Sequence, residues 1–276
     1  MHTQASTKVK LWFALVTLSV FASHAVAACP RPLQVPVSAV GLSVILRAKE
    51  VSGIYPDFLR TVAAKENCEF VFNAMPRARQ ELLFSTGRAD LLIPASRTPR
   101  RDAYGTFVPL VRSRAALISL DPQHALFTSM QDLIARTDVR VVLVRGFDYG
   151  TAYLQLIQTL TQQNRLVLEA DTASVARLLK ANPSYVTIMS STILLGAIPE
   201  DPRLAGLAEK LRFDALEDLP WGESGAYISN TTLKPDEVAQ IAQSLRRQAE
   251  SGSIWKSFQT YYAPAVLKDS IKAYEH

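Results

Sequence analysis

The chain has 276 residues, 48% of them hydrophobic, and a formal net charge of +5. This length can bury the cores of two modest domains. The mild positive charge, without a basic stripe or interleaved aromatic residues, excludes nucleic acid from the expected partners, and no feature favours an oligomer, so we expect a monomer.

The first 27 residues have the layout of a secretory signal peptide. Lys8 and Lys10 precede an apolar run from Leu11 to Ala22, and Ala25-Val26-Ala27 forms a typical cleavage site. The apolar run is too short for a stable membrane span. We therefore expect an exported mature chain, whose net charge falls from +5 to +3 because two lysines and no acidic residue are removed.

Cys29 has two alternative fates. The segment Val26-Ala27-Ala28-Cys29 resembles the lipobox of bacterial lipoproteins, in which the cysteine is acylated. The second cysteine, Cys68, makes a Cys29–Cys68 disulfide the simplest use of both thiols in an oxidising compartment, and we favour this alternative. Closing a loop of about 40 residues should stabilise the fold by roughly 3 to 4 kcal/mol.

Short β-like runs alternate with helical patterns after the first cysteine. The pattern predicts strands over residues 33–37, 69–74 and 90–95, and helices over 56–66 and 77–86. This order is typical of a βαβαβ unit with parallel strands.

The third of these strands runs into a segment rich in hydroxyl and guanidinium groups, Ser96-Arg97-Thr98-Pro99-Arg100-Arg101. The C-terminal edge of a sheet is where open α/β folds bind ligands. A helix beginning near Thr98 would point its first N–H groups at an anion, and an arginine adds a planar fork that fits a carboxylate. The segment therefore predicts half of an anion site.

An extended run over residues 112–120 separates the first unit from a second one of the same kind. Further along, the pattern predicts strands over residues 139–144, 166–169 and 185–189, helices over 149–162 and 172–180, an extended run over 225–229, and a helix entered at Lys234. We interpret this as an α/β fold with two lobes, two hinge crossovers and a ligand cleft between the lobes. Lobe 1 is predicted to contain residues 28–119 and 225–276, and lobe 2 residues 120–224.

Five motifs stand in order along the mature chain: Gly53-Ile54-Tyr55-Pro56-Asp57, Pro76-Arg77-Ala78-Arg79 with Gly87 and Asp90, Ser96 to Arg101, Val142 to Gly146, and Ala226 to Ser229. In order and spacing they resemble the periplasmic solute-binding proteins of ABC importers, family 3, the polar amino acid type. The resemblance implies a type II periplasmic binding protein that captures a small carboxylate-bearing solute, an amino acid or close analogue, and delivers it to an inner-membrane permease. It implies no cofactor and no bound metal.

The resemblance also assigns site residues. Arg101 and Ser96 match the pair that grips the ligand's carboxylate, with Thr98 beside them. The second lobe would contribute Gly146, Phe147, Asp148 and Tyr149, while Arg79 matches a Pro-x-x-Arg pattern and Tyr55 could wall the pocket. Ser190 stands where amino acid binders usually carry the aspartate that holds the ammonium group, which leaves open whether the ligand has an α-amino group.

Two other functions stay open. The mature chain has only His124 and His276, so neither a histidine-based triad nor a histidine metal site is expected. The resembling cyclohexadienyl dehydratases use a cleft carboxylate as general acid, for which Asp148 and Glu223 are the candidates here. The third alternative is an accessory protein that presents its ligand to a membrane sensor.

Overall fold

The computed structural model describes residues 2, 29, 31–48, 50–120 and 126–275. The predicted signal peptide, apart from residue 2, lies outside this part of the chain, as do His124 and His276. Within the described residues, no helix is both long and apolar enough to cross a membrane.

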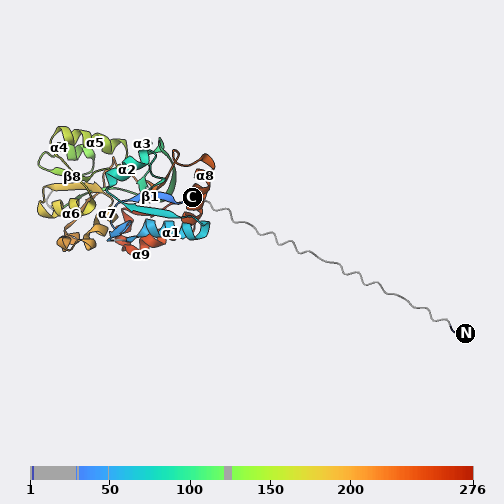
Figure 1. Ribbon diagram of the computed structural model, residues 1–276. Helices are drawn as coiled ribbons and strands as arrows, with labels where there is room; N and C mark the ends of the chain where they lie inside the picture. The colour runs from blue at the N-terminus through green and yellow to red at the C-terminus, as the bar shows by residue number, and fades with distance from the viewer. Residues whose placement is uncertain (1, 3–28, 30, 49, 121–125, 276) are drawn as a thin grey trace.

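The described chain forms two α/β lobes that lie side by side (Figure 1). Lobe 1 is built on a four-stranded sheet of order β13-β6-β12-β5, with smaller sheets β1-β4 and β2-β3. Lobe 2 is built on a five-stranded sheet of order β11-β7-β10-β8-β9. The strands are β1 (Leu33–Val37), β2 (Ile45–Arg47), β3 (Glu50–Ser52), β4 (Phe70–Ala74), β5 (Leu91–Ser96), β6 (Gly105–Ser113), β7 (Ala116–Ser119), β8 (Arg140–Val144), β9 (Leu166–Glu169), β10 (Tyr185–Met189), β11 (Arg212–Asp214), β12 (Gly222–Ser229) and β13 (Ile271–Ala273).

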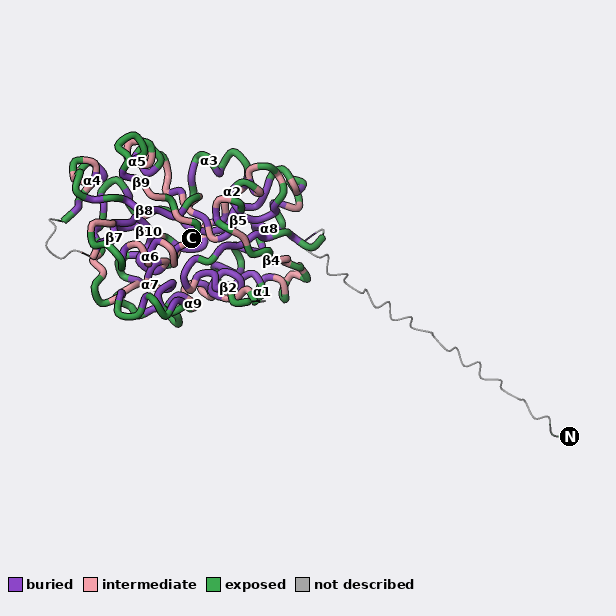
Figure 2. The backbone as a smooth tube through the Cα atoms, turned by 60° about the vertical axis from the view of Figure 1, so that its left-hand side comes forward, coloured by how far each residue is buried: buried purple, intermediate pink, exposed green. Residues whose placement is uncertain are grey.

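Helices cover both sheets and leave their outer faces exposed, whereas most of the strands are buried (Figure 2). They are α1 (Ile54–Glu66), α2 (Arg77–Ser85), α3 (Pro99–Asp102), α4 (Met130–Ala135), α5 (Thr151–Gln162), α6 (Thr172–Ala181), α7 (Ser191–Ala197), α8 (Pro235–Glu250), α9 (Ser253–Tyr261) and α10 (Pro264–Lys268). Three short 3₁₀ turns follow α7, at Ile198–Glu200, Pro202–Leu204 and Ala208–Lys210.

The core of lobe 1 forms where helices α1 and α8 pack on the sheet. Helix α1 buries Phe58, Leu59 and Val62, and α8 buries Ile241 and Leu245, at the spacing of one helix face. Strands β1 and β4 are parallel, as predicted. Strand β5 lies beside β1, where the N–H of Asp90 donates to the carbonyl of Gln34, but its ladder partner is the antiparallel strand β12.

Lobe 2 contains the second predicted βαβαβ unit. Strand β8 pairs in parallel with both β9 and β10, and its residues Val141 to Val144 are buried, as expected for a strand covered on both faces. Helix α5 turns Tyr153, Leu156 and Leu160 inward, which agrees with the predicted face. Strands β7 and β11 extend this sheet in the antiparallel direction.

The predicted lobe boundaries need correction. Strand β6 ends at Ser113 in the sheet of lobe 1, whereas β7 pairs only within lobe 2, so the outward crossover lies at residues 114–115 rather than after residue 119. The return crossover lies at residues 215–221, because β12 already pairs with β6 from Gly222 onward. At the outward crossover the two residues 114–115 join one strand directly to the next, so the apolar pattern does not show where the chain changes lobe.

The disulfide between Cys29 and Cys68 is confirmed. It joins the segment before β1 to the turn between α1 and β4, across 39 residues of sequence. Cys29 is therefore bonded to Cys68, and the described residues contain no free cysteine.

Candidate functional site

A small cavity of about 70 Å³ lies between the two lobes, and we call it the interlobe cavity. Both lobes contribute to its wall. The predicted site residues that line it are Tyr55, Ser96, Arg101, Phe147, Asp148, Tyr149 and Ser190. The fold therefore brings most of the predicted site together, although the cavity is smaller than the roughly 300 to 1,000 Å³ of typical ligand pockets.

Arg79 does not reach the interlobe cavity, contrary to the prediction. It is exposed on α2, whereas Arg77, two residues earlier, is buried and lines the cavity. Two residues correspond to about 200° of rotation on a helix, so only one of the two arginines can face the site.

Thr98 has a structural role instead of a place in the cavity wall. It is the N-cap of α3, and its side chain accepts a hydrogen bond from the N–H of Arg101. Its own N–H donates to the buried hydroxyl of Tyr227. These bonds fix the turn from which Arg100 and Arg101 project.

The carboxylate of Glu81, on α2, is the centre of a buried ion-pair network below the cavity. Arg101 donates to it with Nη2 at 2.7 Å and with Nε at 3.2 Å. Arg77 donates with Nη2 at 2.7 Å and with Nε at 3.0 Å, and Arg100 with Nη2 at 3.3 Å. The guanidinium groups of Arg77, Arg100 and Arg101 therefore all donate to the carboxylate of Glu81.

The network keeps Glu81 ionised. Burial alone would raise the pKa of this carboxyl group, but Arg77 and Arg101 outweigh the effect and lower the pKa from its usual 4.5 to about 2. Burial in turn lowers the pKa of the Arg77 guanidinium, which its attraction to Glu81 opposes.

Lobe 2 meets this network through the loop from Gly146 to Tyr149. The Asp148 carboxylate is 2.9 Å from Nε of Arg100, and its carbonyl oxygen accepts a bond from Arg101 at 3.4 Å. Gly146 has φ +93°, and a Cβ atom there would lie 2.8 Å from the backbone nitrogen of Ala78. We expected this glycine to approach a ligand, but its backbone lies directly against helix α2 of lobe 1.

The lobes also touch on the opposite side of the cavity. A Cβ atom on Gly41 of lobe 1 would lie 2.6 Å from the carbonyl oxygen of Ile193 in lobe 2. The Tyr262 hydroxyl donates to the carbonyl of Thr192 at 2.9 Å, and Arg47 forms an ion pair with Glu200 at 2.8 Å. The lobes therefore contact each other both at the Gly146–Tyr149 loop and at residues 192–200.

Aromatic and hydroxyl side chains complete the wall. Burial raises the pKa of Tyr55 to about 12, and it also raises the pKa of Tyr149, so both phenols remain protonated at neutral pH. Tyr55 is hydrogen-bonded to Ser224, and Tyr149 to the backbone of Ser190. The Ser190 hydroxyl lies 2.9 Å from that of Thr192, so this corner of the cavity is polar and uncharged.

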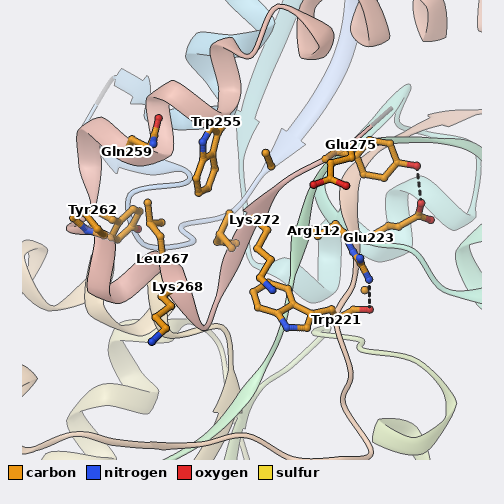
Figure 3. A pocket seen from close by; sticks show the side chains of 15 residues that line it. Arg112, Trp221, Glu223, Trp255, Gln259, Tyr262, Leu267, Lys268, Lys272 and Glu275 are labelled. Carbon is orange, nitrogen blue, oxygen red and sulfur yellow. Dashed lines mark hydrogen bonds between the residues drawn. The ribbon is translucent and has the colours of Figure 1, made fainter.

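The candidate acid Glu223 does not line the interlobe cavity, but it lines a neighbouring pocket of about 150 Å³ together with Ser96 of lobe 1 and Tyr149 of lobe 2. It also lines a larger pocket of about 1010 Å³ on lobe 1, which we call the C-terminal pocket (Figure 3). There its carboxylate pairs with Arg97 at 3.1 Å and accepts a bond from Tyr274. Among the described residues, no group of three or more His, Cys, Asp or Glu side chains could hold a metal ion.

Trp221 forms one wall of the C-terminal pocket and stands in the return crossover itself. The Nζ atom of Lys272 lies 4.2 Å from the centre of the indole ring, and the guanidinium carbon of Arg114 lies 5.5 Å from it (Figure 3 shows Lys272 reaching toward the ring). This pocket is lined by one lobe and its crossover, whereas both lobes line the interlobe cavity.

Sequence reasoning missed several residues of the cavity wall: Ser43, Arg77, Ser113, Arg114, Thr192 and Ser224. It also missed Glu81 beneath the wall. An Arg–Glu pair at i and i+4, like Arg77 and Glu81, is usually a solvated helix pair. The available signal was the segment Pro76-Arg77-Ala78-Arg79, which marks an arginine near the site without saying which one.

Comparisons with known proteins find likeness in structure rather than in sequence. No model of a known protein family matches the chain, and no curated protein sequence does either. A histidine kinase sensor domain described as similar to periplasmic binding proteins superposes with a TM-score of 0.67 at 15% identity, covering 86% of this chain and 97% of that one.

Two amino acid binders give similar values. An ancestral arginine-binding protein bound to arginine has a TM-score of 0.66 at 13% identity, covering 84% of this chain and 98% of that one. An ancestral amino acid-binding protein described as a precursor of cyclohexadienyl dehydratase has a TM-score of 0.64 at 14% identity, covering 84% and 95%. At these identities the likeness concerns the fold alone, and it confirms the predicted two-lobed fold class.

Proposed function

We propose that this chain, which has the two-lobed α/β fold of periplasmic binding proteins, is the periplasmic solute-binding protein of an ABC importer. It would capture a small carboxylate-bearing solute between its lobes by rotation about the two crossovers and present the closed form to an inner-membrane permease. The observation that carries the proposal is the meeting of Arg101 of lobe 1 with the Gly146–Tyr149 loop of lobe 2 at one cavity. The signal-like N-terminus and the disulfide support an exported location.

The polarity of the cavity bears on the class of solute. Its wall carries the buried arginines Arg77 and Arg101, and the one carboxylate in the wall, Asp148, is paired with Arg100. The Ser190 and Thr192 hydroxyls occupy the corner where an ammonium group would need a counter-charge. We therefore propose solutes with a carboxylate, and rank those without an α-amino group first.

The enzyme alternative receives less support from the site. Of its two candidate acids, Glu223 lies outside the interlobe cavity and pairs with Arg97, and the Asp148 carboxylate pairs with Arg100. A general acid needs a proton to give and access to the substrate. The sensor accessory alternative uses the same binding step and differs only in which membrane protein recognises the closed form.

A thermal-shift screen of the mature chain from residue 28 tests the proposal. The panel contains amino acids, their deaminated analogues and small dicarboxylates. A solute at a hundredfold excess over its dissociation constant should stabilise the protein by about 2.7 kcal/mol. Every hit is repeated with Arg101→Ala and with Arg79→Ala, which removes an exposed arginine outside the cavity. Hits that disappear only in Arg101→Ala support a carboxylate-binding receptor, whereas hits that persist in both variants contradict it.

A further inference from the structure

The Glu81 carboxylate is saturated by the chain's own arginines. Its Oε1 accepts from Nη2 of Arg77 and Nη2 of Arg101, both at 2.7 Å, and from Nε of Arg77 at 3.0 Å, while its Oε2 accepts from Nε of Arg101 and Nη2 of Arg100. A carboxylate has about four lone-pair positions. No acceptor capacity remains, and the side chain is only 8% exposed.

Arg101 binds Glu81 in a bidentate geometry, which is the geometry in which it would bind the carboxylate of a ligand. Its Nε and Nη2 groups bind the two oxygens of Glu81 as a fork, and its Nη1 group donates to the carbonyl of Ser96 at 2.8 Å. A bidentate fork can hold one carboxylate at a time. Glu81 and a solute carboxylate therefore compete for the same donors.

The same network holds the lobes together. Arg100 bridges Glu81 of lobe 1 and Asp148 of lobe 2, and Arg101 reaches the carbonyl of Asp148. Gly146 lies against the start of α2, the helix that carries Glu81. These contacts join the two lobes beside a cavity of about 70 Å³.

Arg77 gives Glu81 a second partner. It stands four residues before Glu81 on the same helix and donates to it through both Nε and Nη2. When Arg101 turns to another carboxylate, Glu81 can keep its pair with Arg77, so it is not left as an unpaired buried charge.

From these contacts we propose that Glu81 is an internal substitute for the solute's carboxylate. It engages Arg101 and closes the lobes on themselves until a solute carboxylate displaces it. This inference rests on the proposed function and adds a regulator to that site. Glu81 would set a lower limit on the affinity of the solute, because only a carboxylate that binds Arg101 more tightly than Glu81 does can occupy the cleft.

Acetate, the minimal carboxylate, tests this competition directly. Glu81→Gln keeps the shape of the side chain but removes its charge, so the fork of Arg101 becomes available to an external anion. We expect acetate to bind Glu81→Gln at least tenfold more tightly than wild type, measured by isothermal titration calorimetry at low ionic strength. Glu66→Gln is the matched control, because Glu66 also pairs with an arginine, Arg247, but lies outside the cavity.

Equal acetate affinity in wild type and in folded Glu81→Gln overturns the inference. A gain of the same size in Glu66→Gln also overturns it, because the effect would then be one of net charge. The natural solute is not needed for this test. If Glu81→Gln binds acetate more tightly but no solute of the thermal-shift panel binds, the role of Glu81 is upheld and the proposed solute class is rejected. If a solute of the panel binds but Glu81→Gln shows no tighter acetate binding, the proposed function is upheld and the role of Glu81 is rejected.

A second measurement covers the case in which Glu81→Gln does not fold. Spin labels on cysteines introduced at Leu82 in lobe 1 and Leu154 in lobe 2, both exposed, report the distance between the lobes in a chain that retains Glu81. We expect one short-distance population in buffer without added carboxylate. A main population of open molecules under these conditions would overturn the inference.

Discussion

Arg77 and Arg79 stand two residues apart on α2 and have opposite environments. The first is 4% exposed and donates to Glu81 and to the carbonyl of Pro94, whereas the second is exposed to solvent. A buried guanidinium is tolerated only with such partners. The charge of Arg77 therefore contributes to the stability of the fold through its buried partners, whereas the charge of Arg79 is solvated.

We expect Arg77→Ala to lower the free energy of unfolding by about 3 kcal/mol, because it breaks a buried ion pair. Arg79→Ala should change that free energy by less than about 0.5 kcal/mol, as is usual for surface substitutions. Urea denaturation of the two variants beside wild type measures both values. Similar losses in the two variants would show that the buried and exposed positions are wrongly assigned.

The Glu81 carboxyl group should make stability depend on pH. Its pKa of about 2 lies below the usual 4.5, so the unfolded chain takes up this proton first as the pH falls. The stabilisation is complete above about pH 5 and is lost as the pH falls toward about 2, with a total of about 3 kcal/mol. Urea denaturation at a series of pH values measures how the free energy of unfolding changes with pH.

Glu81→Gln provides the comparison for this pH series. The amide does not titrate, so the fall in unfolding free energy between pH 5 and pH 2 should be shallower than in wild type. Parallel curves for the two proteins would mean that other carboxyl groups cause the acid sensitivity.

At the scale of elements, the disulfide ties the start of the chain to lobe 1. Cys29 precedes β1, and Cys68 follows α1 in the turn that leads to β4, the parallel partner of β1. The crosslink restricts the unfolded chain, since it closes a loop between residues 39 positions apart.

We expect the double variant Cys29→Ser, Cys68→Ser to lose about 3 to 4 kcal/mol of unfolding free energy. Reduction of wild type should produce a loss of similar size, which controls for effects of the serine side chains. Guanidinium denaturation under oxidising and reducing conditions measures both. A stability that is insensitive to both treatments would contradict the expected role of the bridge.

The sequence predicts elements whose apolar pattern agrees with their burial. Strands β1 and β10 have the predicted bounds, because short apolar runs there coincide with buried strands. Strand β9 also has the predicted bounds, although it is an edge strand with Leu168 exposed. Helix α2 also lies close to its predicted bounds, but the apolar pattern does not show which of its residues face inward. It buries the polar residues Arg77, Gln80 and Glu81 together with Phe84, whereas Leu82 is 53% exposed.

The candidate site shows the same limit. The segment from Ser96 to Arg101 could be recognised because its residues are contiguous. Glu81 could not, because its role depends on three arginines that approach from α2 and α3 only in the folded chain. The contact of Gly146 with Ala78 likewise joins residues of different lobes.

At the scale of the whole molecule, Gly146 is, like Gly41, a position at which the lobes approach within the space of a side chain. Gly146 and Gly150 both have positive φ, +93° and +99°, so alanine strains the backbone at either position. Of these two, Gly146 is the one whose added Cβ would meet the other lobe, since a Cβ on Gly150 has no atom within 4 Å.

We expect Gly146→Ala to increase the radius of gyration by holding the lobes apart, whereas Gly150→Ala should leave it unchanged. Each should lose roughly 1 to 3 kcal/mol of unfolding free energy through backbone strain. Small-angle X-ray scattering measures the radius of gyration, and urea denaturation measures the loss of unfolding free energy expected in both variants. Equal radii in the two variants would show that the contact at Ala78 does not limit closure.

The position of Trp221 gives the molecule an optical reporter of its own hinge. Its indole ring stands in the return crossover between two cationic groups, one on the outward crossover, Arg114, and one on β13, Lys272. Rotation of the lobes changes this charged environment, on which indole fluorescence depends. In a mature Trp255→Phe chain, Trp221 would be the single tryptophan, so opening and closing could be followed by its emission in real time without an attached dye.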